Sequence, residues 1–305
     1  MENTNQEYGL VIIGGGPAGS AAAVYAARKN IKSAIITTEF GGQSVVSDDI
    51  QNWIGTAHIS GMDLAKDLEN HVKEYQGEFL NIVKDKVVKV TQNEDKTFSI
   101  KTGKDDIIAK AVLVTTGSVR RKLEAKNADV FEHKGLTYCA SCDGPMYKGE
   151  DVVVVGGGNA AFESALQLSS YCKKVYILNR TDKYRADQIT VDKVLKIENI
   201  QIINNAVINE VLGDKFVDGL IYNNAEKLDV SGIFVEIGQI PNTDYIEFVN
   251  KNTVGNIITD SRTQRTSIEG VWAAGDCTDG LYHQNNIAVG DAVKALENVF
   301  VWLRG

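Results

Sequence analysis

The sequence lacks the features of a membrane, secreted or nucleic-acid-binding protein. No apolar run approaches the roughly 20 residues that cross a bilayer as a helix, and segment 1–9 lacks the basic-then-apolar order of a signal peptide. The formal net charge is −8, whereas nucleic acids bind to basic surfaces. We therefore expect a cytoplasmic protein that binds neither a membrane nor nucleic acid.

Cysteine and histidine are also scarce, with four of each. The histidines have no ligand spacing: they are His58, His71, His133 and His283. Cys139 and Cys142 form one close pair, but tetrahedral zinc would need two further ligands. We therefore expect no metal site. Because a reducing cytoplasm disfavours structural disulfides, we expect the pair to be redox-active. Cys172 and Cys277 carry no comparable signal and are expected to be inert thiols.

Two strand-turn-helix patterns dominate what is present. In the first, the apolar run at 10–13 ends in glycines, as a buried parallel strand does before a helix. An alanine-rich helix follows from Pro17 to about Lys29, with Asn30 as its C-terminal residue, and 33–36 is the next strand. This order predicts a β-α-β unit.

The second pattern lies in the middle of the chain. A strand at 152–155 leads through a glycine turn into a helix at 159–170 and a strand at 175–178. The two patterns are too far apart for a solenoid repeat, so they indicate two doubly wound domains. A chain of 305 residues is long enough for two cores.

Three further strands indicate how the domains divide. They lie at 112–117, 232–238 and 270–276, and a helix follows the last of them. Because the C-terminal stretch is too short to fold alone, we predict an α/β protein of two Rossmann-like domains, the second inserted into the first. The predicted domains are 1–117 with 245–305, and 118–244. Three polar stretches are expected to be hairpin loops: 92–96, 103–106 and 223–227.

The first glycine turn has the spacing of a dinucleotide-binding fingerprint. Gly14 permits a tight turn, Gly16 lets the backbone approach a pyrophosphate, and Gly19 lets the helix pack on the strand. The free N–H groups at the helix N-terminus also favour phosphate. At the end of the second strand, where an acidic residue usually binds the ribose of the cofactor, this chain has Thr37, and Glu39 follows two residues later. A connecting turn is the alternative, but the β-α-β frame favours a bound cofactor.

The pair Cys139 and Cys142, with Asp143 beside it, is the second chemical signal. Two cysteines separated by two residues can close a disulfide, and a helix N-terminus at this pair would favour the reactive thiolate. Asp143 could transfer the proton that dithiol–disulfide conversion requires. The alternative is two structural thiols with Asp143 as a helix cap. Small neighbours and Pro145 favour an accessible redox turn.

The second glycine turn repeats the fingerprint with Gly156, Gly158 and Ala161. At the end of the following strand, an acidic residue would favour NAD and an arginine would favour the 2′-phosphate of NADP. This chain has Arg180 there and Arg185 five residues later, which favours NADPH. A solvated charged loop is the alternative.

With these residues in place, the chain resembles the low-molecular-weight thioredoxin reductases over nearly its whole length. A CxxC-Asp just before the second glycine turn is specific to this group among disulfide reductases. The matching motifs are GGGPAG at 14–19, GGQ at 41–43, NWIG at 52–55, TTGS at 115–118, CASCDG at 139–144, GGGNAAFESAL at 156–166, IGQIPNT at 237–243 and AAGDCTDGLYHQN at 273–285.

The resemblance implies a homodimer that carries FAD and reorients one domain against the other. In such enzymes Cys142 would face the flavin, Cys139 would attack the protein partner, and Asp143 would be the acid/base. The resemblance and the glycine turn together place FAD on Gly14, Gly16, Pro17, Ala18, Gly19, Thr38, Glu39, Gly42, Gln43, Asn52, Gly117, Gly275, Asp276, His283, Gln284 and Asn285. The expected NADPH residues are Gly156, Gly158, Asn159, Ala160, Arg180 and Arg185.

The electron donor is where the chain departs from the family pattern. The family's His-Arg-Arg signature is Asn179-Arg180-Thr181 here, with Arg185 retained. Losing one hydrogen-bond donor to the phosphate could weaken NADPH binding by about 1.5–3 kcal/mol, or roughly ten- to a hundredfold.

The expected function is reduction of thioredoxin or a thioredoxin-like protein by NADPH through FAD and the cysteine pair. Three alternatives remain open. They are a relative that uses NADH, ferredoxin or another flavin as donor, a dithiol oxidase, and a flavin-loaded redox sensor.

Overall fold

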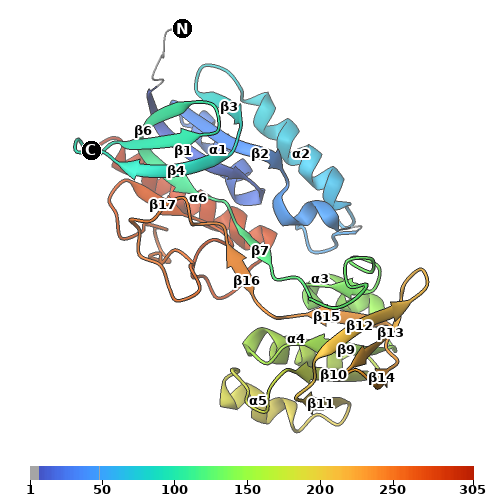
Figure 1. Ribbon diagram of the computed structural model, residues 1–305. Helices are drawn as coiled ribbons and strands as arrows, with labels where there is room; N and C mark the ends of the chain where they lie inside the picture. Colours follow the sequence, from blue (N-terminus) through green and yellow to red (C-terminus); the bar gives the residue numbers. More distant parts are fainter. Residues whose placement is uncertain (1–6, 48) are drawn as a thin grey trace. The chain divides into compact units, whose positions relative to one another are not determined.

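The computed structural model describes residues 7–47 and 49–305, which form two compact units (Figure 1). Unit 1 comprises the described residues up to Val119 together with Ile240–Gly305, and unit 2 is Arg120–Gln239. The sequence predicts the boundaries between the two domains after residues 117 and 244. Residues 1–6, which are part of the segment that lacks a signal-peptide pattern, lie outside the described residues.

Unit 1 is built on a seven-stranded sheet. Its strands are β1 (Glu7–Gly15), β2 (Ser33–Phe40), β3 (Leu80–Lys84), β4 (Val87–Gln92), β5 (Phe98–Thr102), β6 (Asp106–Val114) and β17 (Val271–Ala273). Its helices are α1 (Pro17–Arg28), α2 (Gly61–Glu74) and α6 (Asn285–Trp302), with the 3-10 helix η1 (Gly42–Val46). The strand order is β3-β2-β1-β6-β5-β4.

Strand β6 uses one edge for two partners. Its first half pairs antiparallel with β5, and its last residues pair in parallel with β17. The other edge of β6 pairs in parallel with β1, which pairs in parallel with β2. The carboxyl ends of β1, β2, β6 and β17 therefore meet at one edge of the sheet.

The apolar run in β1 is buried on both faces. Leu10 and Ile12 belong to a core cluster that includes α1 and α6, whereas Val11 and Ile13 belong to the cluster on the other face. This explains why the run is continuous rather than alternating.

Helix α1 ends at the predicted point. Asn30 has φ +55°, a left-handed conformation that asparagine tolerates. Its N–H donates to the Ala27 carbonyl at 2.9 Å, and the N–H of Ile31 donates to the Ala26 carbonyl at 3.0 Å. These bonds satisfy the last carbonyls of the helix and turn the chain toward β2.

Unit 2 contains a parallel five-stranded sheet in the order β11-β10-β9-β15-β8 and an antiparallel sheet of three strands. The parallel strands are β8 (Leu136–Thr137), β9 (Asp151–Val155), β10 (Lys174–Asn179), β11 (Ile200–Asn204) and β15 (Gly232–Val235). The antiparallel strands are β12 (Ile208–Gly213), β13 (Val217–Tyr222) and β14 (Glu226–Leu228). The helices are α3 (Ala140–Asp143), η2 (Gly144–Tyr147), α4 (Asn159–Ser169) and α5 (Gln188–Val194).

The chain crosses between the units twice. The crossing segments form β7 (Ser118–Arg120) and β16 (Gln239–Pro241), which pair with each other. The predicted α/β class with a second Rossmann-like unit inserted into the first is confirmed. All three predicted hairpin loops connect antiparallel strands. Among the described residues, no helix is both long and apolar enough to cross a membrane.

Candidate functional site

The first glycine turn joins the carboxyl end of β1 to the N-terminus of α1. Gly14 has φ +114°, and a Cβ there would lie 2.5 Å from the Thr115 carbonyl oxygen. A Cβ on Gly19 would overlap the Gly14 carbonyl and lie 2.8 Å from Thr115 Oγ1. Both positions require glycine because helix and strands approach closely here.

Gly16 is different, because it faces open space. A Cβ on Gly16 would have Gly42 Cα at 3.9 Å as its nearest neighbour. Gly16 is also the N-cap of α1, and it provides no side-chain cap for the helix. No side chain caps the first N–H groups of α1 and there is space beside Gly16, which fits the pyrophosphate of a dinucleotide. FAD is the dinucleotide that the resemblance places here.

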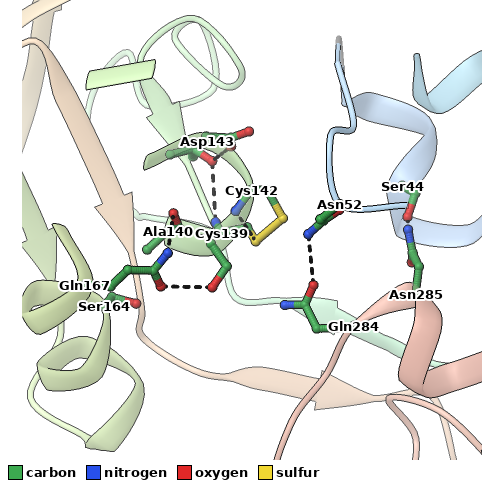
Figure 2. Close-up of a disulfide and its surroundings, with 12 residues drawn as sticks. Ser44, Asn52, Cys139, Ala140, Cys142, Asp143, Ser164, Gln167, Gln284 and Asn285 are labelled. Atoms are coloured by element: carbon green, nitrogen blue, oxygen red, sulfur yellow. Dashed lines mark hydrogen bonds between the residues drawn. A yellow bond between two sulfur atoms is a disulfide. The ribbon is translucent and has the colours of Figure 1, made fainter. Parts of the chain in front are cut away.

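Segments far apart in the sequence join in unit 1 at the start of α6 (Figure 2). Asn52 Nδ2 donates to Gln284 Oε1 at 3.1 Å, and Asn286 Nδ2 donates to the Asn52 carbonyl at 2.7 Å. Ser44 Oγ donates to Asn285 Oδ1 at 3.0 Å. The predicted residues Asn52, Gln284 and Asn285 thus form one cluster at the start of α6.

The other predicted residues of this region line the same sheet edge. Gly275 has φ +76° and lies between Ala18 and Ala288, with Asp276 directly after it. Gln43 Nε2 donates to Ser118 Oγ at 3.3 Å. This bond joins the 41–43 segment to the turn that contains Gly117. The same segment approaches the first glycine turn, because a Cβ on Gly42 would lie 3.4 Å from the Gly16 Cα.

His283 supplies a polar atom for a ligand. Its Nε2 is buried and has no hydrogen-bond partner in the part of the chain that the structure describes. A buried polar atom without a partner is costly, so the site fits a ligand that brings one. Thr38 and Glu39 are exposed at the end of β2, whereas Thr37 is buried and donates to the Glu39 carbonyl at 2.5 Å.

The cysteine pair lies in unit 2 at the carboxyl end of β8. Cys139 and Cys142 form a disulfide with a Cα–Cα distance of 5.3 Å, and both residues are half-buried. Cys139 is the N-cap of the single-turn helix α3, and its Sγ accepts from the Cys142 N–H at 3.2 Å. The prediction that the pair lies at a helix N-terminus is confirmed.

The Asp143 carboxylate lies beside the disulfide turn and accepts a hydrogen bond from Thr137 Oγ1. The backbone N–H of Asp143 donates to the Cys139 carbonyl at 3.1 Å, which fixes the residue against the disulfide turn. Figure 2 shows Asp143 beside Cys139 and Cys142. Burial raises the pKa of Tyr147, and the Asp143 charge contributes in the same direction. The acid/base role of Asp143 stays a prediction.

The other two thiols are buried. Burial raises the pKa of Cys172 to about 11 and that of Cys277 to about 12. Cys277 Sγ also donates to the Ala274 carbonyl at 3.4 Å. Burial and a raised pKa both disfavour the reactive thiolate, so these environments support the prediction that the two thiols are inert.

The second glycine turn joins β9 to α4. A Cβ on Gly156 would clash with the Glu236 carbonyl, whereas a Cβ on Gly158 would meet nothing within 4 Å. Gly158 is the N-cap of α4 and provides no side-chain cap, so this helix N-terminus also fits phosphate. Asn159 and Ala160 begin α4 and are exposed.

The loop after β10 is held against this turn. The Arg185 N–H donates to the Gly157 carbonyl at 2.7 Å, and Asn159 bonds the Asp187 carboxylate and N–H at 3.1 and 2.7 Å. Asn179 is buried, and its Nδ2 donates to the Thr181 carbonyl at 2.7 Å and the Lys183 carbonyl at 3.1 Å. Asn179 therefore organises the loop.

Arg180 and Arg185 are both exposed on this loop. Within residues 7–47 and 49–305, no hydrogen bond or ion pair engages either guanidinium. Their guanidiniums are therefore available to an anionic group, as the NADPH prediction requires.

Sequence reasoning missed several residues of these sites. Ser44 and Asn286 bond predicted residues, and their contacts depend on chain folding across more than 200 positions. Glu236 has its backbone carbonyl beside Gly156 and its side chain buried. Its signal was visible, because it is a charged residue that follows an apolar strand. In the described part of the chain, no three His, Cys, Asp or Glu side chains gather as metal ligands do.

The two glycine turns and the disulfide define a dinucleotide-dependent disulfide oxidoreductase. The chain belongs to the pyridine nucleotide-disulphide oxidoreductase family, whose model matches residues 8–292. Membership implies FAD and a nicotinamide donor, and within the family the chain is of the low-molecular-weight thioredoxin reductase type.

Individual relatives carry different names within this class. A thioredoxin reductase from Giardia duodenalis superposes with a TM-score of 0.92 at 32% identity, covering 98% of this chain and 100% of that one. One component of the alkyl hydroperoxide reductase of Escherichia coli is 37% identical over 99% of this chain, and a Bacillus subtilis protein named NADH dehydrogenase is 34% identical over 98%. The chain spans 59% of each of these two proteins.

Proposed function

We propose that the protein is an NADPH-dependent flavin disulfide reductase that delivers electrons to thioredoxin or a thioredoxin-like protein. The observation that carries this proposal is the Cys139–Cys142 disulfide at the carboxyl edge of the same parallel sheet that holds the second glycine turn. The dinucleotide and the sulfur pair would use one edge of one domain, as ligands of such sheets do.

The flavin would be held by unit 1. The N-terminus of α1 with Gly16 would bind the pyrophosphate, and the cluster of Asn52, Gln284 and Asn285 with His283 would supply polar contacts. When bound, FAD would supply the two-electron chemistry that links a nicotinamide to a disulfide.

The sulfur pair would then carry the exchange chemistry. Reduction of the Cys139–Cys142 bond would take up two electrons and two protons and leave two thiols. Asp143, which follows Cys142 directly, would transfer a proton. The Cys139 thiolate would attack a disulfide sulfur of the partner, forming a mixed disulfide and releasing one partner thiolate. The Cys142 thiolate would attack Cys139 Sγ, which releases the second partner thiolate and restores the Cys139–Cys142 bond.

The unpaired guanidiniums of Arg180 and Arg185 support NADPH as the donor, because they could bind a 2′-phosphate. The name of the Bacillus subtilis relative favours NADH as a second candidate. The name of the Escherichia coli relative likewise favours an alkyl hydroperoxide reductase system as a second candidate for the partner. The family resemblance supports a homodimer, and we place the protein in the cytoplasm as the sequence predicts.

The test is anaerobic titration of the flavin-loaded protein with NADPH and with NADH, followed by turnover with thioredoxin. Cys142→Ser should still let the nicotinamide reduce the flavin but should abolish thioredoxin reduction, because the disulfide can no longer form. Cys172→Ser is the matched control and should turn over normally. Full turnover by Cys142→Ser would disprove the proposed relay, and peroxide release from dithiols without nicotinamide would instead indicate an oxidase.

A further inference from the structure

The topology of unit 2 divides the space over its sheet into two halves. Strand β9 lies between β10 and β15, so the strand order reverses at the glycine turn 156–161. A dinucleotide binds across the carboxyl edge at such a point, with its adenosine ribose toward the strand that follows the turn. The Arg180 loop follows that strand, β10. The nicotinamide half is therefore directed toward the carboxyl ends of β15 and β8.

Glu236 lies at the carboxyl end of β15. Its N–H donates to the Val155 carbonyl at 2.8 Å, and its own carbonyl lies so close to Gly156 that no side chain fits there. The Glu236 side chain is 8% exposed. The Glu236 backbone thus lies directly beside the second glycine turn, on the β15 side of β9, and its side chain is buried.

The two carboxylate oxygens of Glu236 have different partners. Oε1 accepts a hydrogen bond from Ser164 Oγ, on α4, at 2.8 Å. Oε2 has Arg120 Nη1 at 3.8 Å, an ion-pair separation too long for a hydrogen bond. Ser164 therefore fixes the orientation of the carboxylate and Arg120 balances its charge, while Oε2 keeps capacity to accept a hydrogen bond.

We propose that Glu236 binds the nicotinamide half of the electron donor by accepting a hydrogen bond at Oε2. The donors available on that half are the carboxamide N–H group and the ribose hydroxyls. A buried carboxylate that accepts such a bond gains a charge-assisted interaction. This inference rests on the proposed function, since it needs a nicotinamide dinucleotide in unit 2. Ser164 is a positioning residue, because it acts through Glu236.

The proposal predicts that Glu236 contributes to binding of the full dinucleotide but not to binding of its adenosine half. In calorimetric titrations of the oxidised, flavin-loaded full chain, Glu236→Ala should weaken NADP⁺ binding about tenfold or more, the effect of losing a hydrogen bond to a charged group. Binding of adenosine 2′,5′-bisphosphate, which lacks the nicotinamide half, should be unchanged. If the wild type prefers NAD⁺, the pair of ligands is NAD⁺ and AMP.

Two further variants keep the test decisive. Glu236→Gln preserves the shape and should weaken dinucleotide binding severalfold, so it decides the matter if Glu236→Ala does not fold. Glu226→Ala removes an exposed carboxylate from β14, away from the second glycine turn, and should leave both ligands bound as in the wild type.

The outcomes separate the two proposals. Wild-type affinity for the full dinucleotide in both Glu236 variants would overturn the role of Glu236 alone. An equal loss for the full dinucleotide and the adenosine fragment would also overturn it, because the defect would then be general. A wild-type protein that binds neither NADP⁺ nor NAD⁺ would overturn the proposed function itself.

Discussion

The four cysteines occupy two kinds of environment, and burial distinguishes them. Cys139 and Cys142 are half-buried at the end of a strand, whereas Cys172 and Cys277 are 5% and 0% exposed. With pKa values near 11 and 12, the buried thiols would hold about a thousandth or less of their population as thiolate at pH 8. The half-buried thiols of Cys139 and Cys142 should therefore react once reduced, whereas the buried thiols should not.

We predict that iodoacetamide at pH 8 labels two thiols per chain after mild reduction of the folded protein, Cys139 and Cys142. Because raised pKa values keep the buried thiols protonated, Cys172 should begin to react only as the pH rises toward 11, and Cys277 later. Mass spectrometry of the labelled peptides measures this directly. In denaturant all four should react, and Cys172→Ser should lower that number by one. Labelling of Cys277 in the folded protein at pH 8 would contradict the prediction.

At the scale of elements, the glycines of the helix N-termini have separable roles. We predict that Gly16→Ala folds normally, because φ is −70° and the nearest neighbour of the new Cβ is 3.9 Å away. The methyl group should nevertheless lower FAD affinity at least about tenfold, because it occupies the space through which the backbone approaches the pyrophosphate. Flavin fluorescence during titration of the apoprotein with FAD gives the affinity, and circular dichroism gives the fold.

The contrast within α1 and α6 provides the controls. Gly19→Ala should prevent folding, since its Cβ would overlap the Gly14 carbonyl. Gly290→Ala lies in α6 with nothing within 4 Å of the added Cβ, so it should raise the free energy of unfolding by about 0.8–1 kcal/mol through helix propensity. FAD affinity of Gly16→Ala equal to that of the wild type would show that this turn does not contact the pyrophosphate.

The elements show why local patterns predicted part of the fold. Both strand-turn-helix units were predictable because their apolar runs and glycines are contiguous. Helix α2 was missed, although Ser60 Oγ accepts from the Asp63 N–H at 3.0 Å and this capping spacing is visible in the sequence. The sharing of one β6 edge by β5 and β17 was not predictable, because it joins segments more than 150 residues apart.

The same distinction holds for the candidate site. The reactive pair Cys139 and Cys142 follows from residue type and spacing alone. The Asn52–Gln284 contact spans 232 positions, and the environment of Glu236 depends on Ser164 and Arg120 from two other elements. Such contacts are set by packing, which no local pattern encodes.

At the scale of the whole molecule, the hydrophobic cores are separate. Two core clusters consist entirely of unit 1 residues and two consist entirely of unit 2 residues, and none of these clusters mixes the described parts of both units. Because unit 2 is one continuous segment whose entry and exit strands, β7 and β16, pair with each other, its ends lie close together. Its length is typical of an independent domain, about 100–150 residues.

We therefore predict that segment 120–239 folds when expressed alone. It should unfold cooperatively in urea, form the Cys139–Cys142 disulfide and bind the nicotinamide dinucleotide without taking up FAD, because the first glycine turn and its cluster belong to unit 1. Dispersed amide resonances and calorimetric titration measure folding and binding. The same segment with Cys139→Ser should fold and bind equally well but lack the disulfide. A segment that unfolds without a cooperative transition would show that the cores depend on each other despite their separation.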